Sequence, residues 1–312
     1  MTINEHISEF AGLKVLDYSP EDGIANPDKC AFRLGLNWES FDEGEKLEEL
    51  LAAFVTDPGA KHVAALIISD WGGAGQGDSS ASVVEAIVSA REQLAGLRAL
   101  FLGEIICEES EISWITQSDV SAVFEAFPAL TELWLRGANG LQLGRPKHGN
   151  LRKLVIETGG MPAALFREVV SADLPLLEHL ELWLGDDGYG NDVSPEDLRS
   201  LLTGNRFPKL KHLGLRDDCR ADVTASVLAA AGIPGSLESL DLSLGTLSDE
   251  GAEALAASKW LPQLKKLDLH HHFISDATIK KLKKVVPVVV DSERQELSVW
   301  NGEGHRYVAV SE

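Results

Sequence analysis

The chain contains 312 residues, 44% of them hydrophobic, so it can bury a sizeable core. Its 28 Lys and Arg residues are outnumbered by 49 Asp and Glu residues, and the formal net charge of −21 repels nucleic-acid phosphates and anionic lipid headgroups. These numbers permit either one elongated array or two globular domains, but they argue against nucleic acids and membranes as partners.

We find no targeting signal in the sequence. The N-terminal stretch has no basic region followed by an apolar one, and no apolar run approaches the roughly 20 residues that a membrane-spanning helix needs. The three cysteines, Cys30, Cys107 and Cys219, are too widely spaced to indicate a disulfide framework or a close pair of zinc ligands, so we expect buried thiols. The sequence therefore predicts a cytosolic protein.

A six-residue phrase recurs along the chain, with an apolar residue, two variable residues, Leu, one variable residue and then Leu or Ile. Nine copies begin at Ala31, Val63, Leu97, Leu130, Leu151, Leu177, Leu210, Leu237 and Leu264. The fourth and sixth positions are two residues apart, so in a strand their side chains share one face and the residues between them point to the other. Each copy therefore predicts one short strand with a buried face.

The segments between the strands mostly show the 3.6-residue period of helices, which suits the crossovers that parallel strands require. Helices are predicted at residues 45–55, 82–94, 163–170, 195–202 and 251–257. Ser194, Ser248 and Ser275 are predicted N-caps at which helices begin. Residues 137–150 are interrupted by Gly and Pro, so we expect a loop there.

The two ends of the array need covers, because a solenoid otherwise exposes its terminal repeats. Residues 1–30 contain the apolar phrase GLKVLDY and then a Pro- and Gly-rich link, which predicts an N-terminal cap. Within the repeat region, residues 31–290, the apolar run at residues 285–290 predicts a final strand. Residues 291–312 predict a polar tail that is partly disordered. We expect all three segments to form one structural domain.

Strands and helices alternating at this period indicate an α/β leucine-rich-repeat solenoid, a horseshoe with parallel strands on its concave face and mostly helices on its convex face. The phrase TLSDEGAEALAASKWLPQLKKLDL resembles the ribonuclease-inhibitor type of repeat. The phrases AFRLGLNW, SDWGG, EISWITQSDV, LDLSLG, LDLHHH and GHRYVAVSE make the whole chain similar to a family of uncharacterised bacterial cytoplasmic leucine-rich-repeat proteins. That family has no assigned activity or site residues. Some members are encoded beside radical-SAM and ATP-grasp type proteins, which implies a scaffold role among modifying enzymes.

The N-terminal half of the predicted concave face is apolar. Its fifth repeat positions include Ile67, Phe101, Trp134 and Val155. Neighbouring strands lie about 4.8 Å apart, so these side chains would form a stripe roughly 15 Å long, and exposed apolar patches of this kind mark interfaces. We expect a partner protein to bind there, unless the N-terminal cap or residues 103–119 fold over the stripe.

The C-terminal half of the same face is polar, with Gly214 leaving room for a shallow notch among charged side chains. The predicted notch residues are His179, Glu181, His212, Gly214, Asp241 and His270. Arg136, Trp183 and Arg216 are expected to add contacts to the partner. A small ligand would fit such a notch, although the same mixture is typical of an ordinary polar protein interface, and we assign no metal to it.

Three further motifs suggest ligands, but their chemistry argues against each. His270, His271 and His272 are consecutive and leave a strand in different directions, so they cannot all face one ion, and we expect His272 to hydrogen-bond the turn backbone. The segment WGGAGQGDS has the glycine spacing of a phosphate-binding loop, but Asp78 stands where the lysine should be and repels phosphate. The run DDGYGND does not match the EF-hand spacing, which favours a solvated loop.

No nucleophile, base and orienting group can be assembled from the sequence, so we predict no enzymatic activity and no cofactor. The predicted function is a non-catalytic protein–protein interaction scaffold. An apolar projection of the partner would pack on Phe101 and Trp134, while the acidic C-terminal half would steer a basic patch of the partner. The sequence leaves open a sensor or binder of a small ligand at the notch around Gly214 and, more remotely, an enzyme.

Overall fold

The computed structural model describes residues 3–203 and 206–310. Its contacts define two compact units. The N-terminal unit holds residues 3–156 with Ser171–Leu174, and the C-terminal unit holds Glu157–Val170 with the described residues from Pro175 onward. Each unit has the α/β leucine-rich-repeat fold that the repeats predict.

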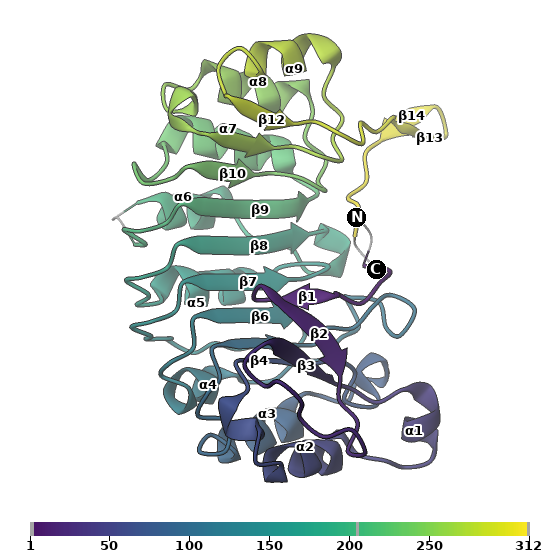
Figure 1. The fold of residues 1–312 in the computed structure, drawn as a ribbon. Coiled ribbons are helices and arrows are strands. Elements are labelled where there is room, and N and C mark those ends of the chain that lie inside the picture. Colours follow the sequence, from purple (N-terminus) through teal and green to yellow (C-terminus); the bar gives the residue numbers. More distant parts are fainter. Residues whose placement is uncertain (1–2, 204–205, 311–312) are drawn as a thin grey trace. The chain divides into compact units, whose positions relative to one another are not determined.

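The N-terminal unit contains parallel strands that pair in chain order from β2 to β6, and an antiparallel strand, β1, at the edge beside β2 (Figure 1). Its strands are β1 (Glu9–Phe10), β2 (Leu13–Asp17), β3 (Cys30–Leu34), β4 (Ala65–Ile68), β5 (Ala99–Leu102), β6 (Glu132–Arg136) and β7 (Lys153–Glu157), which ends at the unit boundary. Its helices are α1 (Trp38–Asp42), α2 (Leu47–Thr56), α3 (Ala81–Ser89) and α4 (Ser121–Ala126), with short 3-10 helices at Ala60–His62 and Ala74–Gln76.

The C-terminal unit continues the pattern with parallel strands that also pair in chain order. These strands are β8 (His179–Gly185), β9 (His212–Asp218), β10 (Ser239–Asp241), β11 (Lys266–Asp268) and β12 (Val288–Val290). The helices are α5 (Ala163–Ser171), α6 (Pro195–Leu202), α7 (Ala221–Ala231), α8 (Asp249–Ala257) and α9 (Asp276–Leu282), with 3-10 helices at Asp187–Tyr189 and Leu261–Gln263. A separate antiparallel hairpin, β13 (Ser298–Trp300) and β14 (Glu303–His305), follows.

The repeat leucines pair as predicted within each unit. Leu66, Leu100 and Leu133 lie opposite one another in β4, β5 and β6, and Leu180, Leu213, Leu240 and Leu267 do so in β8 to β11. All seven are completely buried. The burial stabilises each repeat by about 1.5–3 kcal/mol per leucine, before the entropic cost of ordering the chain.

The first repeat copy is two residues out of the predicted register. Phe32, not Leu34, lies opposite Leu66, and Leu34 pairs with Ile68. Phe32 takes the core position because its ring packs near Phe54 of α2, with ring centroids 5.9 Å apart. A shift of two preserves the faces of the strand, but it places Arg33 beside Ile67 in the row of fifth positions.

The predicted helix starts are confirmed. The Ser194 hydroxyl accepts from the Asp197 backbone N–H and the Asp197 carboxylate accepts from the Ser194 backbone N–H, forming a capping box at α6. Ser248 and Ser275 accept backbone N–H groups at the starts of α8 and α9. Residues 137–150 contain no helix, as their Gly and Pro content predicts.

Both ends of the array carry strands. Residues 1–30 include β1 and β2, and β12 lies in the predicted final strand. The expectation of a partly disordered tail is wrong for its described residues, because β13 and β14 pair and Val310 is buried, its N–H donating to Asp217 Oδ1 over 2.9 Å. No helix among the described residues has both the length and the apolar character that a membrane crossing requires.

Candidate functional site

The predicted apolar stripe of the N-terminal unit is covered by the chain's own N-terminal segment. Phe10 of β1 packs on Phe101 and Trp134, with ring centroids 6.0 Å away in both cases. Ile67 and Phe101 are 0% exposed, and Trp134 is half-buried. The expectation that Ile67 and Phe101 line an open surface is therefore wrong.

Small side chains explain why the cover fits. Ala65 and Ala99, in the third repeat positions of β4 and β5, belong to the same buried cluster as Phe10. The ring of Phe10 packs into this cluster beside Phe101, and burial of one such ring is worth about 1.5–3 kcal/mol. Val155, the last member of the predicted stripe, is also completely buried. Partner binding by these four residues stays a prediction that requires their exposure.

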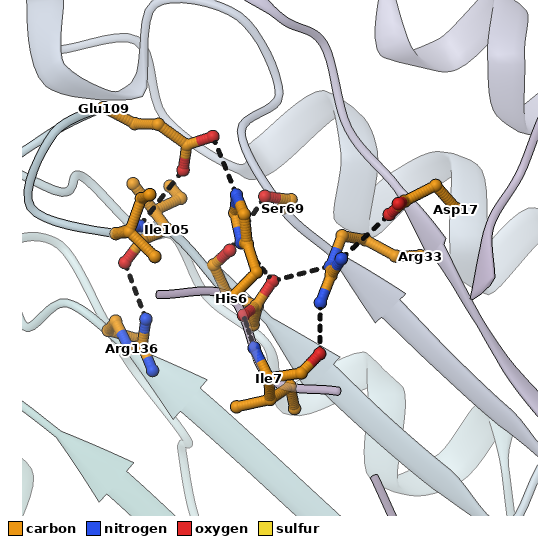
Figure 2. Close-up of polar contacts among 10 residues, drawn as sticks. His6, Ile7, Asp17, Arg33, Ser69, Ile105, Glu109 and Arg136 are labelled. Carbon is orange, nitrogen blue, oxygen red and sulfur yellow. Dashed lines mark hydrogen bonds and ion pairs between the residues drawn. The ribbon is translucent and has the colours of Figure 1, made fainter. Parts of the chain in front are cut away.

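A buried carboxylate anchors the cover (Figure 2). Glu104 is 0% exposed, and its Oε2 lies 2.8 Å from His6 Nδ1 and accepts from Arg33 Nε over 2.8 Å. Its Oε1 accepts from the Ile7 N–H over 2.8 Å, and the carbonyl of Ile7 accepts from Arg33 Nη2. A buried carboxylate without partners is strongly destabilising, so these contacts fix residues 6 and 7 in place.

His6 also contacts Glu109, with 3.1 Å between Nε2 and Oε1. Hydrogen bonds to Glu104 and then Glu109 raise the pKa of His6 to about 9, although its partial burial opposes the shift. His6 is therefore an imidazolium at neutral pH, and it neutralises part of the acidic charge around it.

Arg136 does not line an exposed surface, contrary to expectation. Its side chain is buried, Nη1 donates to the Ile105 carbonyl over 2.6 Å, and the guanidinium lies 5.1 Å from the centre of the Phe101 ring (Figure 2). The hydrogen bond and the cation–π contact both hold Arg136 inside the unit.

An acidic cavity of about 740 Å³ lies in the N-terminal unit among the loops that follow β3, β4 and β5. Its lining includes Phe41, Asp70, Glu108, Glu109, Glu111 and Trp114. Burial raises the pKa of Asp70, whose carboxylate accepts from the Gly72 N–H. No ion pair is found for Glu108 or Glu111 within the described ranges, and both are exposed, as is Trp114 at 60%. Sequence reasoning missed this cavity, although acidic and aromatic residues gather between positions 108 and 114.

In the C-terminal unit, β8 and β9 bring together the centre of the predicted notch. His179 lies opposite His212, and the two imidazoles stack with centroids 4.1 Å apart and an angle of 15° between their planes. Glu181 lies opposite Gly214. A Cβ at Gly214 would approach Glu181 Cγ to 3.0 Å, so the absent side chain is what makes room for the glutamate. We call His179, Glu181 and His212 the histidine–glutamate cluster.

One oxygen of Glu181 is occupied by neighbouring donors. Oε1 accepts from Trp183 Nε1 over 2.8 Å and from Arg216 Nη1 over 2.6 Å. Burial raises the pKa of Glu181, but the nearby His179, Arg216 and Trp183 outweigh it and hold that pKa well below its usual range. The carboxylate is therefore ionised at neutral pH.

The two histidines leave nitrogens unused. Nε2 of His179 and Nε2 of His212 are buried and have no hydrogen-bond partner among the described residues; His179 Nε2 lies 3.5 Å from Glu181 Oε2. Leaving a buried polar atom unpaired costs about 1–3 kcal/mol. Burial, and then the neighbouring His179, lower the pKa of His212 to about 4, so His212 is neutral at pH 7.

The remaining predicted notch residues lie further out. Asp241 joins through Arg216, whose Nε is 3.5 Å from Asp241 Oδ2, and Arg216 also covers the buried Trp183 ring at 4.9 Å. His270 belongs to a separate pair, with 2.7 Å between its Nδ1 and Asp268 Oδ1. The structure therefore brings His179, Glu181, His212 and Gly214 together, and it places His270 outside them.

The histidine triplet behaves as expected. His272 is buried; its Nδ1 accepts from the Ile274 N–H over 2.9 Å, and its Nε2 lies 3.3 Å from the Asp291 carbonyl oxygen. These contacts hold the turn backbone, as predicted. His271 has a φ of 56°, so the chain turns sharply within the triplet.

The two rejected loops serve local structure. In WGGAGQGDS, Trp71 Nε1 donates to the Asp78 carbonyl, and the segment helps to line the acidic cavity, which disfavours phosphate. In DDGYGND, the Asp186 carboxylate accepts from the Gly188 N–H. Asp186, Asp187 and Cys219 also lie close enough together to hold an ion, and burial raises the pKa of the Cys219 thiol to about 11.

Known proteins support the repeat assignment. A leucine-rich-repeat family model matches residues 236–256. A crystal structure of a Bacteroides fragilis protein is 32% identical, covers 84% of this chain and 75% of its own, and superposes with a TM-score of 0.76. An internalin from Listeria monocytogenes is 16% identical over 86% of this chain and 82% of its own, with a TM-score of 0.30. No curated protein matches the sequence significantly.

Proposed function

The chain belongs to the same family as the Bacteroides fragilis protein, and part of it matches a leucine-rich-repeat model; on this basis we propose that it is a non-catalytic protein-interaction scaffold. Repeat proteins of this kind use extended surfaces built by successive units to hold other proteins. The composition and charge of the chain support a cytosolic location and a partner with a basic segment, and disfavour nucleic acid and membrane partners.

The observation that carries this proposal is the acidic cavity of the N-terminal unit. Glu108 and Glu111 present exposed carboxylates without an ion pair among the described residues, and Trp114 exposes an indole beside them. An arginine or lysine side chain satisfies both features, because it pairs with a carboxylate and packs over an aromatic ring. The partner is therefore proposed to insert basic side chains into this cavity.

The partner-binding site predicted on the concave face is less suitable, because its apolar residues are covered and its carboxylates already have basic neighbours. In the N-terminal unit a partner would have to displace Phe10 to reach Phe101. In the C-terminal unit the acidic fifth positions already have basic neighbours: Arg216 for Glu181 and Asp241, and Lys266 for Asp268. Paired carboxylates attract a basic patch less strongly than unpaired ones, so the acidic cavity is the better binding surface.

The alternative, a binder of a small ligand at the notch around Gly214, is favoured by one observation, the unused nitrogens of His179 and His212. It does not compete with partner binding, because it uses different residues.

Affinity capture from native lysate tests the scaffold proposal. The variant Glu108→Gln/Glu111→Gln/Trp114→Ala should retain its melting temperature, since all three side chains are exposed, and should lose about tenfold or more of the captured partner, as a hot-spot aromatic and two charges are removed. The control Glu92→Gln/Glu125→Gln removes the same charge from exposed sites of the same unit and should capture normally. Equal capture by all three proteins, read by mass spectrometry, would reject the cavity as the binding surface.

A further inference from the structure

We infer that the histidine–glutamate cluster is a binding site for a divalent transition-metal ion of the zinc class. His179, Glu181 and His212 each offer one ligand atom, and the three atoms lie within 4.8 Å of one another. The inference concerns the C-terminal unit and does not depend on the proposed scaffold function.

Histidines at matching positions of two paired parallel strands can face one ion, whereas the consecutive histidines 270–272 cannot. His179 and His212 occupy the same position of neighbouring strands, and their rings stack, so each ring offers a nitrogen close to the carboxylate of Glu181. His212 Nε2 has no hydrogen-bond partner among the described residues, although buried ring nitrogens normally have one, and His179 Nε2 has only the Glu181 carboxylate, at 3.5 Å. A shared ion would satisfy both at once.

The donor types select the class of ion. Two imidazole nitrogens and one carboxylate oxygen are typical zinc ligands, bound at about 2.0–2.2 Å, whereas calcium and magnesium prefer oxygen ligands alone. Three protein ligands leave the fourth position of a tetrahedral zinc ion open to water or to a solute. The cluster therefore fits an exchangeable site better than a closed structural one.

The surroundings of Glu181 resemble the supporting shell of a metal ligand. Trp183 and Arg216 both donate to Oε1, which fixes the carboxylate and leaves Oε2 facing His179 at 3.5 Å. Such outer hydrogen bonds orient ligating carboxylates in metal sites. Gly214 keeps the space beside Glu181 Cγ free.

An ion would reach the cluster from the side of His179. The His179 side chain is 28% exposed, but its Nε2 is buried, so the ring must turn slightly as the ion enters. The nearest positive charges are already paired: Arg216 with Glu181, and Lys266 with Asp268 at 2.8 Å. They oppose the ion less than unpaired cations would.

Zinc titration of tag-free, chelator-treated protein in competition with a chromogenic chelator tests the site. We expect one ion per chain with a Kd of about 1 μM or below, and a loss of at least about 100-fold in the His179→Ala/His212→Ala variant. The variant Asp187→Asn/Cys219→Ser, which alters the other group of close ligands, should bind zinc like the unaltered protein.

Cobalt substitution adds a second readout. Co²⁺ bound by nitrogen and oxygen should give visible absorption without a thiolate charge-transfer band, and Trp183→Phe should weaken the site by about 10–100-fold while leaving its ligands in place. Circular dichroism of each metal-free variant verifies that it is folded. Unchanged zinc affinity in a folded double-histidine variant, or no binding by the unaltered protein at tens of micromolar zinc, would overturn the inference.

Discussion

Each of the two units contains a buried glutamate near its sheet, and the two glutamates are stabilised by different kinds of neighbour. In the N-terminal unit Glu104 is bound by Arg33 and by His6 and Ile7 of a segment that lies across the sheet. In the C-terminal unit Glu181 is bound by Arg216 and Trp183, which stand in the repeats themselves. The difference follows from the neighbouring side chains: an apolar row that includes Phe101 is unfavourable in water and needs a cover, whereas a polar row can remain in contact with solvent.

The covered face of the N-terminal unit and the polar face of the C-terminal unit also differ in which polar atoms lack a hydrogen-bond partner. The cover satisfies Glu104 and seals the apolar cluster around Phe101. On the polar face, neighbouring strands satisfy Glu181 yet leave His212 Nε2 without a hydrogen-bond partner among the described residues, and His179 Nε2 with only the Glu181 carboxylate at 3.5 Å. A face built from repeats alone therefore keeps potential for a ligand, and a face closed by a separate segment does not.

Removing the Phe10 ring, which covers the apolar face of the N-terminal unit, should have the largest effect on the free energy of unfolding. Phe10→Ala deletes a side chain that is 3% exposed, so urea denaturation should show a loss of about 3–5 kcal/mol in the free energy of unfolding of the N-terminal unit. The dye ANS should also bind more strongly, because Phe101 becomes exposed. Trp300→Ala removes a ring that is 71% exposed and serves as the control. A loss below about 1 kcal/mol without extra ANS binding would show that the cover is not docked in solution.

A substitution on the polar face of the C-terminal unit should lower the stability by a smaller amount. Gly214→Ala places a Cβ about 3.0 Å from Glu181 Cγ and forces the glutamate away from Arg216 or Trp183, which should cost about 1–3 kcal/mol. Gly235→Ala is the matched control, because a Cβ there meets nothing within 4 Å and the residue is exposed. Equal stability of the two variants in thermal melts would mean that Glu181 is not confined by the facing strand.

The smallest effect is a pH dependence of the cover. The pKa of His6 is raised to about 9 from 6.5, so its pairing with Glu104 stabilises the fold fully below about pH 6.5 and the contribution is lost as the pH rises through about 9. Because His6 is partly exposed, the loss should be on the order of 1 kcal/mol. Urea midpoints at about pH 6.5 and 9.5 measure it, and His6→Gln should remove this part of the difference. An identical pH response in both proteins would assign the effect to other groups.

Periodic features were predictable from the sequence because they repeat. The leucines, the strands and the capped helix starts at Ser194, Ser248 and Ser275 all follow from local spacing. The register of the first copy was mispredicted, because both Phe32 and Leu34 fit the core and only packing against Phe54 distinguishes them.

The sites were less predictable because they depend on contacts outside the repeat. Nothing local to Phe10 indicates that it meets Phe101; the available signal was the pair of small residues Ala65 and Ala99 in the same buried cluster. The acidic cavity combines three loops that follow separate strands. In contrast, the meeting of His179, Glu181 and His212 was predicted, because all three occupy repeat positions on strands in register.

The short hairpin of β1 and β2 also affects how the chain behaves in a crowded solution. β2 pairs with the edge of β3 that would otherwise be free. β1, the edge strand beside β2, is only two residues long, and one of the two is the charged Glu9. Free edges and bare apolar faces are the two features by which sheet proteins recruit copies of themselves into aggregates. One stretch of fewer than twenty residues covers both of these features in the N-terminal unit, so deleting the residues before Asp17 is expected to promote self-association.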